Sequence, residues 1–197
     1  MYQNKIITEP KWKSWIIQTT TPLFTPDQCN QIIASGRAQK PQQAQVGMNK
    51  PEGGTDTKKR VTTISWIPFQ EMGHMYQDLN TFIQKANENH FGFGDIQVTE
   101  QAQFTEYPEG GFYDWHMDCD VNMEHEPPVR KISMTLLLND PKEFEGGDLE
   151  LMAPGKFANL KQGHAICFAS FLNHRVNPVT KGMRQSLVCW FGGKPFR

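Results

Sequence analysis

The chain has 197 residues, of which 38% are hydrophobic and 21% are charged. This length and composition predict a single folded domain with a full hydrophobic core and exclude a wholly disordered chain. The 20 Lys and Arg residues balance 21 Asp and Glu residues, and the net charge of -1 gives no electrostatic attraction to nucleic acid or to an anionic membrane. No apolar run reaches the ~18 residues of a membrane span, and residues 1–15 lack the apolar stretch of a signal peptide. We therefore expect a cytoplasmic protein with no nucleic-acid or membrane partner.

The first helical signal is a capping box. The four residues TPDQ that begin at Thr25 combine a capping threonine, a proline at the first helical position and a glutamine three residues on, which predicts a helix. Ile32 and Ile33 would form its apolar face. Residues 38–59 are polar and show no periodicity, so we expect a loop there, either a simple connector or a flap over a site.

A strand and a longer helix are predicted next. Residues 60–67 (RVTTISWI) are rich in β-branched and aromatic side chains, which favours a strand. Over residues 69–89, apolar side chains recur at steps of three and four, the period of an amphipathic helix. A stripe of this kind is typical of core packing, so we expect this helix to lie against a sheet.

From residue 96 onward the pattern changes to short apolar runs separated by Gly, Pro, Asn and Asp. Eight runs predict strands, at residues 96–107, 112–118, 129–138, 148–152, 156–160, 164–169, 173–178 and 184–192. Short strands with frequent turns favour a sandwich or jelly roll of two antiparallel sheets over a parallel sheet. The expected fold class is therefore α+β, with the N-terminal helices packed on one sheet.

The four cysteines are scattered along the chain and form no CxxC pair. A zinc ribbon and a thioredoxin-type redox site are therefore excluded. We expect free, buried thiols, as in proteins of a reducing compartment.

Two histidines and one aspartate carry the chemical signal. His116 and Asp118 are two residues apart at the end of a predicted strand, so their side chains share a face and can converge on one cation. His174 is followed ten residues later by Arg184, across a predicted turn over residues 178–183. Two His and one carboxylate form the facial triad of non-heme Fe(II) oxygenases, and a guanidinium can bind a carboxylate through two hydrogen bonds. These residues together predict Fe(II) chelated by a dicarboxylic keto acid.

At this point the sequence resembles the 2-oxoglutarate/Fe(II) dioxygenases, and within them the prolyl 4-hydroxylase-like branch. Residues 104–118 are similar to the segment Y-x-x-G-x-x-Y-x-x-H-x-D of that branch. Residues 174–184 look like its closing segment, particularly in the bacterial PKHD-type hydroxylases. Residues 24–33 and 60–66 resemble its leading helix and the strand after its variable loop.

The resemblance implies a double-stranded β-helix in one domain over residues 1–197. Residues 1–95 would supply helical support and the variable loop, and residues 96–197 the jelly-roll catalytic core. The iron ligands that it implies are His116, Asp118 and His174. The residues implied for 2-oxoglutarate are Arg184, Tyr107 and Ser186. Those implied for the pocket of the target peptide are Tyr113, Arg130 and Trp190.

Two features depart from the pattern of this branch. Leu137 occupies the position of a further cosubstrate tyrosine of the oxygen-sensing prolyl hydroxylases, so Tyr107 or Ser186 would have to supply the polar contacts. Tyr113 is three residues from His116, and strand alternation places the two on opposite faces unless a bulge near Gly110 shifts the register.

The function that the resemblance implies is hydroxylation of a C–H bond, with oxidative decarboxylation of 2-oxoglutarate to succinate and CO2. A prolyl residue in a peptide or protein is the expected target, with Fe(II), O2 and ascorbate as reductant, and no catalytic side chain beyond the metal centre. Two alternatives stay open. One is the same chemistry on a free amino acid, another small molecule or another protein side chain. The other is a β-sandwich that binds partners without turnover.

Overall fold

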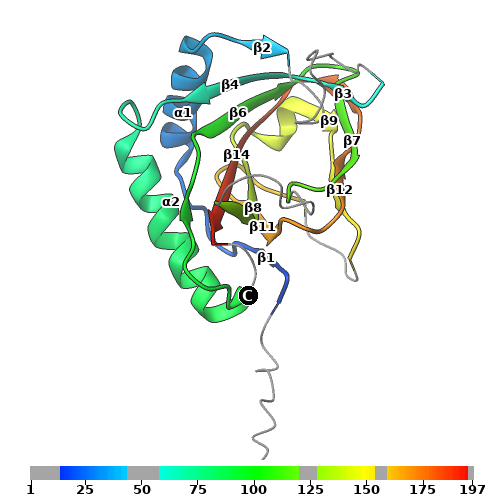
Figure 1. The fold of residues 1–197 in the computed structure, drawn as a ribbon. Helices are drawn as coiled ribbons and strands as arrows, with labels where there is room; N and C mark the ends of the chain where they lie inside the picture. The colour runs from blue at the N-terminus through cyan, green and yellow to red at the C-terminus, as the bar shows by residue number, and fades with distance from the viewer. Residues whose placement is uncertain (1–13, 44–57, 120–127, 154–158, 195–197) are drawn as a thin grey trace, which may run out of the picture.

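A computed structural model of the chain describes residues 14–43, 58–119, 128–153 and 159–194 (Figure 1). Two antiparallel sheets form its two main layers. The major sheet contains, in order, β1 (Ile16–Gln18), β11 (Ala165–Ala169), β8 (Val129–Leu137), β14 (Arg184–Gly193), β6 (Ala102–Tyr107), β4 (Thr63–Ile67) and β2 (Gln42–Gln43), with β5 (Gln97–Val98) beside β14. The minor sheet contains β10 (Leu149–Leu151), β12 (His174–Val176), β7 (Phe112–His116) and β3 (Arg60–Val61). In a separate two-stranded antiparallel sheet, β9 (Phe144–Gly146) pairs with β13 (Val179–Gly182).

The helix α1 (Pro26–Ala38) begins where the capping box predicts. The Thr25 hydroxyl accepts a hydrogen bond from the Gln28 N–H, and the Gln28 side chain accepts one from the Thr25 N–H. Two backbone donors that the first turn leaves free are thereby satisfied, so the local sequence alone sets the start of the helix. Its buried face includes Ile32 and Ile33, as expected.

The helix α2 (Gly73–Ala86) is shorter at its start than the predicted span of 69–89 and continues as a π-helical turn over Asn87–Phe91. Pro68 and the residues up to Met72 form a turn instead. Met75, Leu79 and Ile83 are almost fully buried, and this stripe packs on the major sheet as predicted (Figure 1).

Strand alternation divides the major sheet into a helix side and an interior side. On β14, Leu187 and Phe191 lie in the core against the helices, whereas Arg184, Ser186 and Trp190 face the minor sheet. The space between the two sheets therefore receives polar and charged side chains of β14, among them Arg184 and Ser186.

Several predicted elements differ from the observed ones. The run 60–67 is divided between the two sheets, because β3 pairs with β7 and β4 pairs with β6. The N-terminal half thus adds strands to both layers, beyond helical support. The run 96–107 also forms two strands, and the predicted turn over 178–183 contains β13. Residues 159–160 of the predicted strand 156–160 are not in a strand.

Some predictions lie outside the described residues: these are the middle of the loop 38–59 and residues 156–158 of the predicted strand 156–160. All four cysteines are described, and each is a buried free thiol, as expected. Within the described ranges, no helix is long and apolar enough to cross a membrane.

Candidate metal centre

The structure brings His116, Asp118 and His174 together at one end of the minor sheet. His116 on β7 and His174 on β12 are directly paired across the ladder, and their ring centroids are 4.0 Å apart. Asp118 follows β7, and its backbone N–H donates a hydrogen bond to the Ser170 carbonyl. Its carboxylate oxygens lie 3.7 Å from His116 Nε2 and 3.6 Å from His174 Nε2. One ligand atom of each residue lies within 4.8 Å of the other two, so a single ion could touch all three.

Backbone carbonyls fix which ring nitrogen of each histidine is available. His116 Nδ1 lies 2.8 Å from the Asp114 carbonyl, and His174 Nδ1 lies 3.0 Å from the Leu172 carbonyl. A carbonyl oxygen can only accept, so Nδ1 carries the proton in both rings. Nε2 then keeps its lone pair and faces Asp118, the orientation that metal-binding histidines show. The donor set therefore fits Fe(II).

Electrostatics keep this centre in its metal-binding protonation state. Burial, followed by repulsion from His174, lowers the pKa of His116 to about 4. Burial raises the pKa of Asp118, but attraction from His174 and His116 and the hydrogen bond from Ser133 outweigh it, so the pKa lies below its ordinary value. A metal requires an unprotonated imidazole nitrogen and an ionised carboxylate. The Ser133 hydroxyl, 2.7 Å from Asp118 Oδ2, also holds the carboxylate in place.

Tyr113 lies on the same face as His116 because the ladder contains a bulge. Tyr113 and His116 are three positions apart on β7, but their partners Val176 and His174 are only two positions apart on β12. The extra residue reverses the alternation. The irregularity lies between Tyr113 and His116, whereas the sequence suggested one near Gly110. The two rings stack with centroids 3.5 Å apart, and burial raises the pKa of Tyr113.

Arg130 and Trp190 lie together beside the carboxylate end of the centre. Arg130 forms a two-point ion pair with Glu100, with both nitrogen–oxygen distances at 2.6 Å. Its guanidinium carbon lies 3.9 Å from the centre of the Trp190 ring, whose other neighbour is Trp66. The Trp190 indole N–H contributes to lowering the pKa of Asp118, although its geometry forms no hydrogen bond with any described residue.

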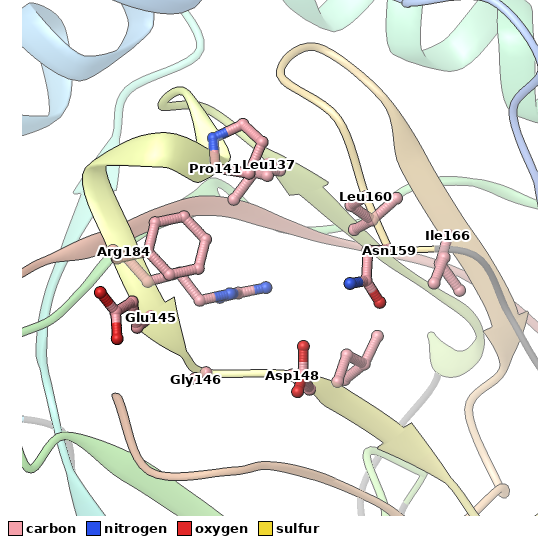
Figure 2. Close-up of a pocket in the computed structure, with 12 residues that line it drawn as sticks. Leu137, Pro141, Glu145, Gly146, Asp148, Asn159, Leu160, Ile166 and Arg184 are labelled. Atoms are coloured by element: carbon pink, nitrogen blue, oxygen red, sulfur yellow. The ribbon is translucent and has the colours of Figure 1, made fainter. Parts of the chain in front are cut away.

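Arg184 points into a cavity of about 370 Å³ (Figure 2). Leu137, Asp148 and Ile166 are among the residues around its guanidinium. Arg184 is only 3% exposed, and its Nη1 donates a hydrogen bond to Ser186 Oγ at 3.0 Å. Burial lowers the pKa of Arg184, and the nearby Tyr107 and Asp148 oppose this effect. Within the described ranges Arg184 forms no ion pair, although the carboxylates of Glu145 and Asp148 also line the cavity.

The His–Asp–His cluster does not line this cavity, but both lie on the interior side of the major sheet. Ser133, which binds Asp118, and Leu137, which lines the cavity, are on one face of β8 and four residues apart. Four residues of a strand span about 13 Å. The predicted iron ligands and the predicted cosubstrate arginine are therefore neighbours along one surface. Leu137 gives the cavity an apolar wall at the position of the absent tyrosine.

Sequence reasoning did not identify Ser133, Glu100 or Arg60 at this site. Buried small polar residues inside an otherwise apolar strand were the available signal for Ser133, which is 1% exposed. Glu100 and Arg60 carried no local signal, because their contacts with Arg130 and Tyr113 join distant parts of the chain.

The known proteins that this chain resembles in sequence point to one family. The 2OG-Fe(II) oxygenase superfamily matches residues 102–192. A PKHD-type hydroxylase of Colwellia psychrerythraea is 34% identical over 147 residues, which are 72% of this chain and 64% of that protein. Another, of Teredinibacter turnerae, is 35% identical over 118 residues, 56% of this chain and 52% of that protein. The matches thus span less than two thirds of these curated relatives.

Solved structures show the same fold at low sequence identity. A Pseudomonas putida prolyl-4-hydroxylase superposes with a TM-score of 0.69 and 20% identity, over 92% of this chain and 94% of that one. A viral collagen prolyl hydroxylase of Paramecium Bursaria Chlorella virus-1 gives a TM-score of 0.70 and 16% identity, over 91% and 97%. The two-sheet core is thus a double-stranded β-helix, as expected. The comparisons thus support the resemblance to the 2OG-Fe(II) oxygenase superfamily and to its PKHD-type branch.

Proposed function

We propose that the protein is a 2-oxoglutarate- and Fe(II)-dependent dioxygenase that hydroxylates a prolyl residue of a peptide or protein. The observation that carries this proposal is the placement of the His–Asp–His cluster and the unpaired Arg184 on one interior surface. A protein that only binds partners has no need for this combination. The names of the PKHD-type and prolyl-4-hydroxylase relatives support the choice of a prolyl target.

The three clustered side chains would hold the metal. His116 Nε2, His174 Nε2 and the Asp118 carboxylate are the ligands in this proposal, and three positions would remain for 2-oxoglutarate and O2. Iron bound there supplies the activation of O2, coupled to decarboxylation of 2-oxoglutarate to succinate and CO2. The protein's own part is to orient the ligands, through Ser133 and the two carbonyl contacts, and no further side chain acts as a catalyst.

Arg184 would bind the far carboxylate of 2-oxoglutarate. Arg184 forms no ion pair with the carboxylates that line its cavity, and burial strengthens each hydrogen bond that the guanidinium donates. Ser186 fixes the orientation of Arg184 by accepting a hydrogen bond from it. Tyr107, whose ring centre lies 5.5 Å from the guanidinium carbon, would add a polar contact near Arg184.

Tyr113, Arg130 and Trp190 would form the pocket for the target residue. Tyr113 covers His116, and Trp190 lies beside Asp118, so the two rings flank the proposed metal. The ion pair with Glu100 holds Arg130 over Trp190 and fixes the position of the indole.

The domain organisation, the reductant and the compartment are also part of this proposal. The whole chain would act as one domain, because the main core joins helix residues to both early and late strands of the major sheet. Ascorbate would serve as reductant. The cytoplasm would be the compartment, because four buried free thiols suit a reducing environment.

Succinate release tests the function. The protein is incubated with Fe(II), 2-oxoglutarate and ascorbate, first alone and then with proline-containing peptides, and the peptides are examined for a mass gain of one oxygen atom. We expect proline-containing peptides to increase succinate release by the unaltered protein. The variant H174A should lose this release, and the surface variant R37M should retain it. No release under any condition would favour the non-catalytic binding protein. If free amino acids but not peptides increase succinate release, the substrate would be a free amino acid in place of a prolyl residue of a peptide.

A further inference from the structure

Two buried side-chain nitrogens in the described residues have no hydrogen-bond partner: Arg60 Nε and Trp190 Nε1. Both adjoin the metal centre. A buried donor without an acceptor is unfavourable, so such groups are rare unless a water or a ligand supplies the acceptor. Trp190 belongs to the target pocket described above. Arg60 has no role in the function proposed so far.

Arg60 crosses the interior from the minor sheet to the major sheet. It lies on the edge strand β3, and its Nη2 donates a hydrogen bond to Gln103 Oε1 on β6 at 3.0 Å. Its guanidinium carbon lies 4.3 Å from the centre of the Tyr113 ring. His116 covers one face of that ring at 3.5 Å, so Arg60 must lie against the other face. The guanidinium is thus separated from an iron ligand by the thickness of one phenol ring.

The charge of Arg60 is not neutralised by any described carboxylate. Five arginines lie in the described part of the chain. Three of them form ion pairs, namely Arg37 with Glu106, Arg130 with Glu100, and Arg175 with Glu150. Arg184 does not, and it is proposed to bind an anionic cosubstrate. Arg60 is the other exception, half-buried with only the neutral Gln103 as a hydrogen-bond partner. A half-buried cation in this state favours an incoming anion.

Arg60 and Arg184 are too far apart to serve the same ligand group. Gln103, which anchors Arg60, pairs with Val188 on β14, whereas Arg184 pairs with Tyr107. These two rows of the sheet are four residues apart, or about 13 Å. Arg60 therefore lies at the end of the interior that holds Tyr113 and Trp66, away from the Arg184 cavity.

We propose that Arg60 binds a carboxylate of the primary substrate and thereby positions the hydroxylated carbon beside the metal centre. This inference rests on the proposed dioxygenase function and narrows its substrate class to molecules with a carboxylate near the reacting C–H bond. The carboxylate could belong to an acidic side chain next to the target residue or to the α-carboxylate of a terminal or free amino acid. The Arg60 guanidinium carries further N–H donors besides the Nη2 group that binds Gln103, and a guanidinium can offer either group two parallel hydrogen bonds.

Binding of matched probes tests this role without turnover. Dissociation constants are measured by calorimetry under anaerobic conditions, with Fe(II) and 2-oxoglutarate and also without them. Each probe pair differs only in a carboxylate. The pairs are a capped proline peptide with Glu or Gln after the proline, a peptide ending in proline or in prolinamide, and free L-proline against L-prolinamide. The proteins are the unaltered chain, R60M, R60K and the surface control R37M, each checked for thermal unfolding.

We expect the unaltered protein and R37M to bind the carboxylate member of at least one pair about tenfold more tightly or better. R60M should lose this preference, and R60K, which keeps the charge but not the two-point geometry, should retain part of it. The pair that shows the preference identifies the source of the carboxylate. Equal binding of both members of every pair, binding of no probe, or a preference that survives in R60M would overturn the proposal. If R60M does not fold, an undiminished preference in R60K overturns it.

Succinate release by the unaltered protein without any probe keeps the two proposals apart. Release together with equal binding of the paired probes overturns the role of Arg60 and leaves the dioxygenase function standing. A lack of release under all conditions, with a carboxylate preference that depends on Arg60, overturns the function and retains the binding site.

Discussion

Arg184 should contribute strongly to 2-oxoglutarate binding and little to the stability of the protein without it. The guanidinium is 3% exposed and has one hydrogen-bond acceptor, Ser186, among the described residues. A hydrogen bond between buried charged groups contributes about 1.5–3 kcal/mol. Loss of a two-point contact with a carboxylate should therefore cost about 3 kcal/mol, which raises Kd about 100-fold. R184M removes this contact and preserves much of the side-chain volume.

The same substitution removes a buried cation that no ion pair compensates within the described residues. Replacement of buried charge by an apolar group of similar size is often neutral or stabilising, and the loss of the Ser186 contact costs about 1 kcal/mol. Without 2-oxoglutarate, the free energy of unfolding of R184M should therefore stay within about 1 kcal/mol of the unaltered value. At 100 times its Kd, 2-oxoglutarate should stabilise the unaltered protein by about 2.7 kcal/mol and R184M far less.

Two measurements check this prediction. Anaerobic calorimetry gives the Kd for 2-oxoglutarate, and thermal unfolding with and without 2-oxoglutarate gives the ligand-induced rise in Tm. R37M, in which an exposed arginine is lost, serves as the matched control. An unchanged Kd in R184M would refute the role of Arg184, and a large drop in Tm without ligand would refute the claim that its charge is uncompensated.

Three further outcomes are expected. S133A should weaken metal binding about 10–100-fold, as measured by metal titration, because Asp118 loses its hydrogen bond; an unchanged affinity would show that Ser133 is dispensable. G147A should weaken 2-oxoglutarate binding and lower Tm, because the added Cβ would lie 2.9 Å from Arg184 Cδ and the backbone has a φ of +69°. The control is G110A, which also has a positive φ but has open space around it. If both variants weaken 2-oxoglutarate binding equally, displacement of Arg184 is excluded as the cause. Thiol reagents should react slowly with the folded protein and fully in denaturant, because burial raises the pKa of the thiols and leaves little thiolate. Fast reaction with the folded protein would contradict the burial of these thiols. The affected thiols are Cys29, with a pKa of about 11, Cys167 and Cys189.

Local signals predicted the elements that local contacts determine. The capping box at Thr25 sets the start of α1 through contacts three residues apart. The two-residue spacing of His116 and Asp118 led to the expectation that they converge, and the fold brings them together with His174. The family resemblance rested on these segments, and the comparisons confirm it.

Features that depend on distant partners could not be predicted. The division of residues 60–67 between two sheets depends on β6 and β7 being available as partners, since the run itself reads as one strand. The bulge that turns Tyr113 towards His116 depends on its pairing with β12. The freedom of Arg60 from any described carboxylate, and the pairing of Arg130 with Glu100, likewise follow from tertiary packing alone.

The central claim is that His116, Asp118 and His174 form one iron site that works together with Arg184. Anaerobic titration with Fe(II) in the presence of 2-oxoglutarate tests it most directly, because chelation of Fe(II) by a 2-oxo acid gives a visible charge-transfer absorption. The account predicts an absorption that saturates at a single Fe(II) per chain, disappears in H174A and needs far more 2-oxoglutarate in R184M. An absorption of full strength in a folded H174A protein would contradict the account.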